Sequence, residues 1–119
     1  TELLMVRRGA DDRVCNLLAT AALYVLKDGW RVAPGVVFES LVSMYYPDTR
    51  LPHLYFTVPS MFDGLERVEL GERTLHPLIA FPISERESQL ARTDHGDALE
   101  SLWESKATDV MDWSRASVL

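Results

Sequence analysis

Apolar residues recur at helical spacing near the start of the chain. Between Asp12 and Gly29 they recur three or four residues apart, at Val14, Leu17, Leu18, Ala21, Ala22 and Val25. This spacing places them on one face of a helix, the face that packs against a core. Asp11 and Asp12 offer negative charge to the helix N-terminus, and Lys27 followed by Gly29 is typical of a helix C-terminus. The pattern therefore predicts an amphipathic helix between Asp12 and Gly29.

Short runs of β-branched, aromatic and aliphatic residues predict the strands. They cover residues 2–7, 36–38, 53–58, 67–70 and 74–81. Gly71-Glu72 separates the last two runs and favours a hairpin. Pro59 ends the third run, and the two prolines within residues 45–52 indicate a loop before it. Residues 60–64 are expected to be irregular or to form one helical turn.

A strand passes directly into a helix within residues 75–87. The apolar run meets Pro82, and Ser84 and Glu87 then have the spacing of a capping box. In that motif the side chain of each residue bonds the backbone N–H of the other. The junction contains no nucleophile with a base, no metal-ligand cluster and no glycine-rich loop. It therefore predicts architecture rather than chemistry.

A second short helix is expected after His95-Gly96. Asp97 is suited to cap it, and its apolar face would hold Ala98, Leu99, Leu102 and Trp103. The tail that follows is mixed, with an extended segment expected at residues 110–113. Together the elements predict the α+β class, with a mixed, mainly antiparallel sheet and helices packed against it.

Length and composition favour one globular domain over residues 1–119. Apolar residues make up 47% of the chain and charged residues 25%, with a formal net charge of −6. Nucleic-acid binding requires a basic surface, so this charge argues against it. No apolar run is long enough for a membrane span. Cys15 is the only cysteine, which excludes an intrachain disulfide and favours a reducing, cytoplasmic setting in which Cys15 is a buried, inert thiol.

The sequence predicts no catalytic residues, no cofactor and no metal site. His53, His76 and His95 show no metal-ligand spacing, and a single cysteine removes the usual zinc clusters. The acidic pairs fall mostly in first turns or on polar faces of helices, where solvated charge is the simpler explanation. One alternative stays open: a hydrolase whose site is assembled from dispersed carboxylates and histidines, among them His53 and His76.

Seven segments of the chain, taken in order, resemble the suppressor of fused domain in its bacterial single-domain form. They are Glu2-Leu3-Leu4-Met5, Tyr24-Val25, Ala33-Pro34-Gly35, residues 46–54, Ile83-Ser84-Glu85-Arg86-Glu87, residues 97–104 and residues 114–118. The resemblance implies that this chain is similar to roughly the C-terminal two-thirds of the full family domain. It also implies a protein-binding module rather than an enzyme. Animal members sequester Gli-type transcription factors, and many bacterial members look like immunity proteins encoded beside secreted toxins.

In the animal proteins a tyrosine at a helix end and an aspartate after a glycine turn help to hold the Gli peptide. Tyr24 matches the tyrosine, but Val36 follows Gly35 where the aspartate would stand. Without that carboxylate the charge that would pair with a basic or histidine-bearing peptide is absent. The resemblance therefore carries no Gli-binding role over to this chain.

Together with this resemblance, the sequence predicts a non-catalytic, cytoplasmic, bacterial protein-binding domain, and the resemblance implies an immunity protein that neutralises a toxin by binding it. An acidic chain suits this role because many toxic nucleases are basic. Exposed aromatic residues anchor interfaces, although in a small domain they also complete the core. The candidate partner-binding residues are Tyr24, Trp30, Tyr45, Tyr46, Asp48 and Arg50. The other alternative is a homo-oligomer that associates through an unpaired strand at the sheet edge.

Overall fold

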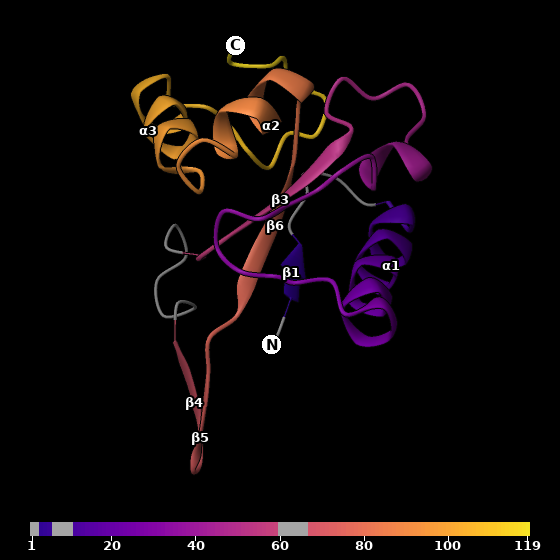
Figure 1. Cartoon of the computed structure of the whole chain (residues 1–119), viewed down its shortest axis with the longest axis vertical. Helices are drawn as coiled ribbons and strands as arrows, with labels where there is room; N and C mark the ends of the chain where they lie inside the picture. The colour runs from indigo at the N-terminus through magenta and orange to yellow at the C-terminus, as the bar shows by residue number, and fades with distance from the viewer. Residues whose placement is uncertain (1–2, 6–10, 60–66) are drawn as a thin grey trace.

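The computed structural model describes residues 3–5, 11–59 and 67–119 of the chain. Its helices and strands are β1 (Leu3–Met5), α1 (Arg13–Asp28), β2 (Val37–Phe38), the 3-10 helix η1 (Val42–Met44), β3 (His53–Thr57), β4 (Val68–Leu70), β5 (Arg73–Leu75), β6 (Leu78–Ile83), α2 (Glu85–Ala91) and α3 (Asp97–Ser105). The β4–β5 hairpin extends away from the rest of the fold (Figure 1).

Strand β6 is the centre of the main sheet, whose strand order is β1-β6-β3-β2. It pairs in parallel with β1, where Leu3 lies opposite Leu78, and antiparallel with β3, where His53 lies opposite Ile83. Strand β2 adds an antiparallel edge beside β3. One parallel and two antiparallel pairings confirm the predicted mixed, mainly antiparallel sheet of an α+β fold.

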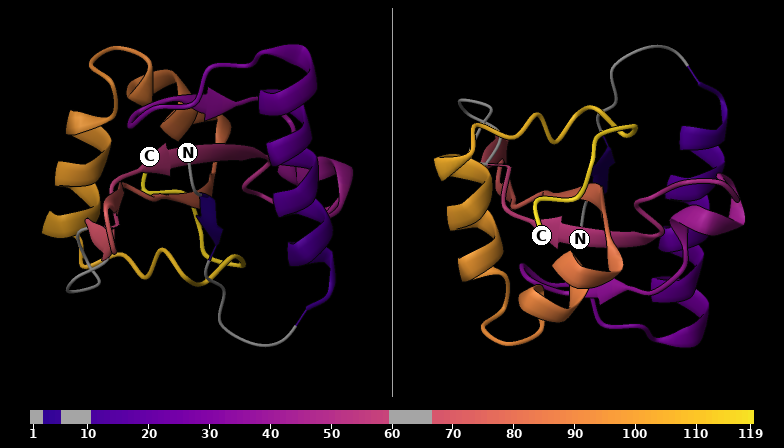
Figure 2. Two further views of the ribbon diagram at one scale, coloured as in Figure 1. Left: turned by 90° about the horizontal axis from the view of Figure 1, so that it is seen from below. Right: turned by 90° about the horizontal axis from the view of Figure 1, so that it is seen from above.

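Helices cover both faces of this sheet because its central strands are apolar on both sides. Figure 2 shows α1 on one face and α2 and α3 on the other. Leu54 and Phe56 of β3 pack into the core under α1, which also contains Leu17. Tyr55 points the opposite way and packs with Phe81 under α2 and α3, as side-chain alternation along a strand requires. Each face therefore has its own hydrophobic core.

The run at residues 74–81 is divided between two sheets, whereas the sequence predicted one strand there. Strand β5 ends at Leu75 in the hairpin, and β6 begins at Leu78 in the main sheet. The chain leaves one sheet for the other at His76 and Pro77. The hairpin itself is confirmed, with Leu70 opposite Arg73. Residues 60–64 lie outside the described part of the chain.

Strand β6 continues through Pro82, which lies opposite Leu54 of β3. The Pro82 carbonyl accepts from Arg115 Nη2 at 3.3 Å, so the backbone polar positions of Pro82 face away from β3. β1 pairs with β6 only at residues 78–80. The missing N–H therefore falls on an outer edge of the sheet, where proline is tolerated. The C-terminal tail covers this edge.

At the start of α1, Asp11 Oδ1 accepts from the Arg13 N–H at 2.9 Å, whereas Asp12 at the N-cap position makes no side-chain cap bond. Of the other three predicted helix ends, two match the sequence pattern. Gly29 ends α1 in the left-handed conformation, and the capping box of α2 is formed, with the Glu87 N–H donating to Ser84 Oγ at 3.1 Å. Asp97 does not cap α3. Gly96 stands at the N-cap position and has no side chain that could accept a hydrogen bond. The Ala98 N–H donates instead to Asp94 Oδ2 at 3.1 Å.

Two further expectations from the sequence are wrong. Residues 110–113 form turns rather than an extended segment. Cys15 is exposed on α1, because Leu17 and Ala21 carry the buried part of that helix and Cys15 points elsewhere.

Candidate functional site

Tyr24 and Trp30 form an aromatic patch at the C-terminal end of α1. Their rings stack with centroids 4.3 Å apart, and the edge of Trp30 meets Phe38 of β2 at 5.0 Å. The Tyr24 hydroxyl points to the Met44 sulfur at 3.9 Å. Trp30 remains 41% exposed and Met44 58% exposed, so the patch presents aromatic and thioether surface to solvent. Groups of this kind are common anchors in protein interfaces.

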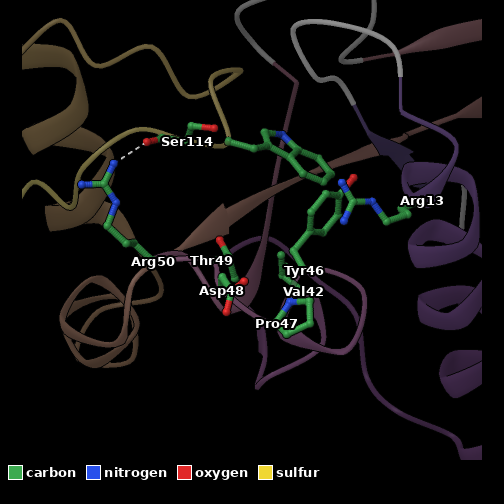
Figure 3. Close-up of a pocket in the computed structure, with 9 residues that line it drawn as sticks. Arg13, Val42, Tyr46, Pro47, Asp48, Thr49, Arg50 and Ser114 are labelled. Atoms are coloured by element: carbon green, nitrogen blue, oxygen red, sulfur yellow. Dashed lines mark hydrogen bonds between the residues drawn. The ribbon is translucent and has the colours of Figure 1, made fainter.

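Tyr46, Asp48 and Arg50 lie together in a pocket of about 290 Å³. Figure 3 shows these side chains with Arg13 of α1 on one side and Ser114 of the tail on the other. The full lining is Arg13, Val42, Tyr46, Pro47, Asp48, Thr49, Arg50, Trp113 and Ser114. Three segments far apart in the sequence therefore build this pocket.

The wall of the pocket beside α1 is aromatic and cationic. The Arg13 guanidinium lies 4.0 Å above the centre of the Tyr46 ring, which in turn meets the edge of Trp113 at 5.7 Å. Arg13 also donates to Asp11 at 2.8 Å, and this hydrogen bond holds the pKa of the Asp11 carboxyl well below its usual range. The same bond raises the pKa of Arg13. The charge of Arg13 is thus largely balanced within the chain.

The opposite wall carries charges that are open to a partner. Asp48 is exposed, and no hydrogen bond or ion pair joins its carboxylate to another residue in the described ranges. Arg50 donates from Nη2 to the Ser114 carbonyl at 2.6 Å, which fixes its guanidinium without neutralising it. An anion and a cation at the same mouth can each pair with an opposite charge on a second protein.

Tyr45 is held by hydrogen bonds within the chain and has a structural role. Its hydroxyl contacts the Thr20 hydroxyl on α1, and its carbonyl accepts from Arg13 Nη1 at 3.3 Å. These bonds hold the segment after η1 against the helix. The six predicted residues therefore form an aromatic patch, a charged pocket and one structural link. We call the surface that carries the patch and the pocket the α1–loop face.

Arg13, Trp113 and Ser114 complete the pocket and were not among the predicted partner-binding residues. The place of Trp113 in the pocket depends on the path of the tail, which no local spacing predicts. Arg13 directly follows the two acidic residues before α1, and that signal indicated only a helix start.

A buried ionic network lies on the other face of the sheet. Glu87 is fully buried and accepts from Arg115 Nη1 at 3.0 Å and from the Trp103 indole at 3.1 Å. The Ser84 N–H donates to the same carboxylate at 2.8 Å. Burial alone would raise the pKa of Glu87, but these hydrogen bonds, led by those from Arg115, hold it below its ordinary value. The network attaches the C-terminal tail to the start of α2.

The histidines are separated in the structure. His53 is buried, with Nδ1 accepting from the Ser40 N–H at 2.8 Å and Nε2 contacting Glu85, so both ring nitrogens are engaged. His76 and His95 line two different pockets, and His53 is in the lining of neither. Across residues 3–5, 11–59 and 67–119, no three His, Cys, Asp or Glu side chains are grouped as metal ligands. None of the described helices is long and apolar enough to cross a membrane.

The fold and its order of segments define a member of the suppressor of fused class. The family model for the suppressor of fused protein (SUFU) matches residues 1–116, so the chain belongs to this family. It is also similar to Immunity protein YqcF of Bacillus subtilis (strain 168), with 35% identity over 119 residues. That match covers 99% of this chain and 62% of the Bacillus protein.

A solved structure confirms the fold at greater sequence distance. The crystal structure of a SUFU homologue from Neisseria gonorrhoeae FA 1090 superposes with a TM-score of 0.79 at 16% identity. It covers 98% of this chain, which spans 62% of the Neisseria protein. The chain therefore accounts for less than two-thirds of the length of both relatives.

Proposed function

We propose that this chain is an immunity protein, which binds a protein toxin and neutralises it by covering part of the toxin surface. The observation that carries the proposal is the 35% identity to Immunity protein YqcF over 119 residues. Neutralisation by binding requires anchoring side chains on an exposed surface and no reaction centre. The separate positions of the histidines favour this role over hydrolysis by an assembled site.

The α1–loop face is the proposed contact surface. It combines the half-exposed Trp30, stacked on Tyr24, with the open charges of Asp48 and Arg50. Aromatic and arginine side chains contribute much of the binding energy in protein interfaces, and complementary charges fix orientation and speed association. Trp30 would supply the apolar anchor, and Asp48 with Arg50 would select the partner.

The test is co-expression with a toxin encoded beside the gene for this chain. We expect cells that produce both proteins to survive, and the purified pair to elute as one complex in size-exclusion chromatography. A toxin that kills equally well in the presence of this chain, and that does not bind it, would contradict the proposal.

Surface variants test the proposed face. Trp30→Ala removes the anchor, and Asp48→Arg reverses an exposed charge; each is expected to weaken toxin binding about tenfold or more. Glu72→Arg makes the same charge change on the exposed turn of the β4–β5 hairpin and is the matched control. Equal loss of affinity in all three variants would place the contact elsewhere.

Self-association through the sheet edge stays a prediction. Strand β1 pairs with β6 on one side, and in the described part of the chain no strand pairs with its other side. Unpaired strand edges are templates for association. Light scattering across a range of concentrations would reveal a dimer, and a constant monomer mass would contradict one.

A further inference from the structure

The negative charge of the chain is concentrated in one region. The segment from Thr93 to Ser114 carries six carboxylates and one lysine, a net charge of −5 out of the −6 of the whole chain. The acidic residues are Asp94, Asp97, Glu100, Glu104, Asp109 and Asp112. Elsewhere acids and bases nearly cancel. The segment consists of α3 and the connections on either side, and α3 itself lies on the opposite side of the sheet from α1 (Figure 2).

A groove of about 590 Å³ runs between α3 and the segment that follows it. Its apolar lining is Trp103, Val110 and Met111, and its remaining lining is Glu100, Glu104, Thr108 and Asp109. All three charged residues of the lining are acidic. The groove therefore has an apolar floor and a negative rim. The pocket of the α1–loop face differs, because it contains both acidic and basic side chains.

The carboxylates of the groove are held in different ways. Glu100 accepts from the Tyr55 hydroxyl and from Thr57 Oγ1, the latter at 3.0 Å, so its position is fixed. Burial, together with the hydrogen bond to Glu100, raises the pKa of Tyr55, so the Tyr55 hydroxyl stays a neutral donor in this bond. Glu104 is exposed, with no side-chain bond to another described residue. Its charge is available to a partner.

The nearby lysine does not neutralise the groove. Lys106 directs its ammonium to the Val118 carbonyl at 2.9 Å, toward the tail rather than toward a carboxylate. It is also absent from the lining of the groove. A cation from outside the chain would therefore find the Glu104 carboxylate, which no described internal cation occupies.

We propose that this groove is a second recognition site, which takes a lysine or arginine side chain from a basic segment of a partner protein. The aliphatic stem of such a side chain would lie along Trp103 and Met111, while its charged end reaches Glu104. This inference rests on the proposed function only in taking a protein as the partner.

The spacing of the acidic residues also sets the shape of the occupant. Asp97, Glu100 and Glu104 follow one face of α3 at intervals of three and four residues. At the rise of an α-helix they extend over about 10 Å. A complementary segment therefore presents two or three basic side chains over about the same length, with an apolar residue between them for the floor of the groove.

A short synthetic peptide that alternates lysine and leucine is the probe, and the same peptide with glutamate in place of lysine is its control. Both are titrated into the ¹⁵N-labelled chain at low salt and followed by NMR. We expect shifts at residues 97–111 with the lysine peptide and none with the glutamate peptide. Binding should weaken steeply with added salt, because the contact is charged.

Two charge reversals make the site specific. Glu104→Lys is expected to weaken peptide binding about tenfold, and Glu104→Gln about threefold, because each removes a carboxylate from the rim. Glu72→Lys changes the net charge as Glu104→Lys does but lies on the hairpin, so it should leave the affinity within twofold of the parent. Circular dichroism confirms that the variants are folded.

Two results would overturn the groove as a recognition site. One is equal weakening by Glu104→Lys and Glu72→Lys, which would mean diffuse attraction to an acidic protein. The other is a set of NMR shifts centred outside residues 97–111. The peptide experiment needs no toxin, so loss of toxin neutralisation with intact peptide binding would contradict the proposed function alone.

Discussion

The buried network under α2 and α3 and the α1–loop face hold their side chains in opposite ways. Under α2 and α3, Glu87 and Arg115 are buried and bonded to each other, and Tyr55 donates to Glu100. On the α1 side, Asp48 and Trp30 remain open to solvent. The first arrangement fixes one conformation of the tail and helices. The second leaves surface that no intramolecular contact requires, which is what a binding face needs.

This difference separates residues that stabilise the fold from residues that are free to serve a partner. When a buried charge loses its partner, no water takes the partner's place. Removing one member of a buried pair is therefore costly. An exposed charge exchanges one solvated state for another, so its removal costs little. Substitutions in the buried network and on the α1–loop face should therefore affect stability and binding in opposite proportions.

The largest effect on stability is expected for Glu87→Ala. It leaves the Arg115 guanidinium buried without its carboxylate and removes the acceptor of the Trp103 indole. Loss of one partner of a buried pair costs about 3–5 kcal/mol of unfolding free energy. Urea denaturation followed by tryptophan fluorescence measures the change. Glu72→Ala on the hairpin is the control, and an equal cost for both would contradict the role of the network.

The next largest loss of stability is expected for Gly96→Ala, with Gly29→Ala as its matched control. A Cβ at Gly96 would lie 1.9 Å from the Tyr55 hydroxyl, whereas at Gly29 nothing lies within 4 Å. Both glycines have positive φ, so both substitutions strain the backbone, by about 1–2 kcal/mol. The clash should bring the cost at Gly96 to about 2–4 kcal/mol. Thermal unfolding that shifts equally for the two variants would mean that Tyr55 moves aside freely.

Lowering the pH should reduce the difference in unfolding free energy between the parent protein and the Glu87→Gln variant. The pKa of Glu87 is held below its ordinary value of 4.5 in the fold, so the charged form stabilises the protein above about pH 4.5. That contribution is lost as the pH falls through the lower pKa of the folded state. Carboxyls shared by both proteins, such as Asp11 and Glu85, cancel in the comparison. A difference in unfolding free energy that stays constant between pH 7 and pH 3 would contradict this role of the Glu87 charge.

The smallest effect on stability is expected on the α1–loop face. Asp48→Ala removes an exposed carboxylate and should change the unfolding free energy by less than about 0.5 kcal/mol. The same variant should weaken toxin binding measurably. Chemical denaturation and calorimetric titration on one preparation give both values. A large loss of stability would mean that Asp48 is part of the scaffold, which would contradict the contrast between the buried network and the α1–loop face.

Local signals in the sequence predicted much of the fold. The spacing of Leu17 and Ala21 gave α1, and Ser84 with Glu87 gave the start of α2, because helix faces and caps depend on residues within one or two turns. The division of residues 74–81 between two sheets was missed. The composition of a continuous β-rich run does not indicate which partner strand each part of it pairs with.

The candidate site was predictable only in part. Tyr46, Asp48 and Arg50 share one loop, so loop composition was enough to place them together. Arg13 and Trp113 join them through the packing of α1 and the tail, which depends on the whole fold. The acidic groove is similar: the sequence contains the charges on α3, but only the structure shows the apolar floor beside them.

The central position of β6 also constrains how the protein can fold. Leu3 of β1 pairs with Leu78 of β6, and β3 also forms its longest pairing with β6. Neither pairing can form before β6 is present. Contacts between residues so distant in sequence form slowly, because a long loop must close before they stabilise anything. On the ribosome, β1 and β3 would emerge without their shared partner. The main sheet should therefore assemble late, in one cooperative step, once Ile83 has been synthesised.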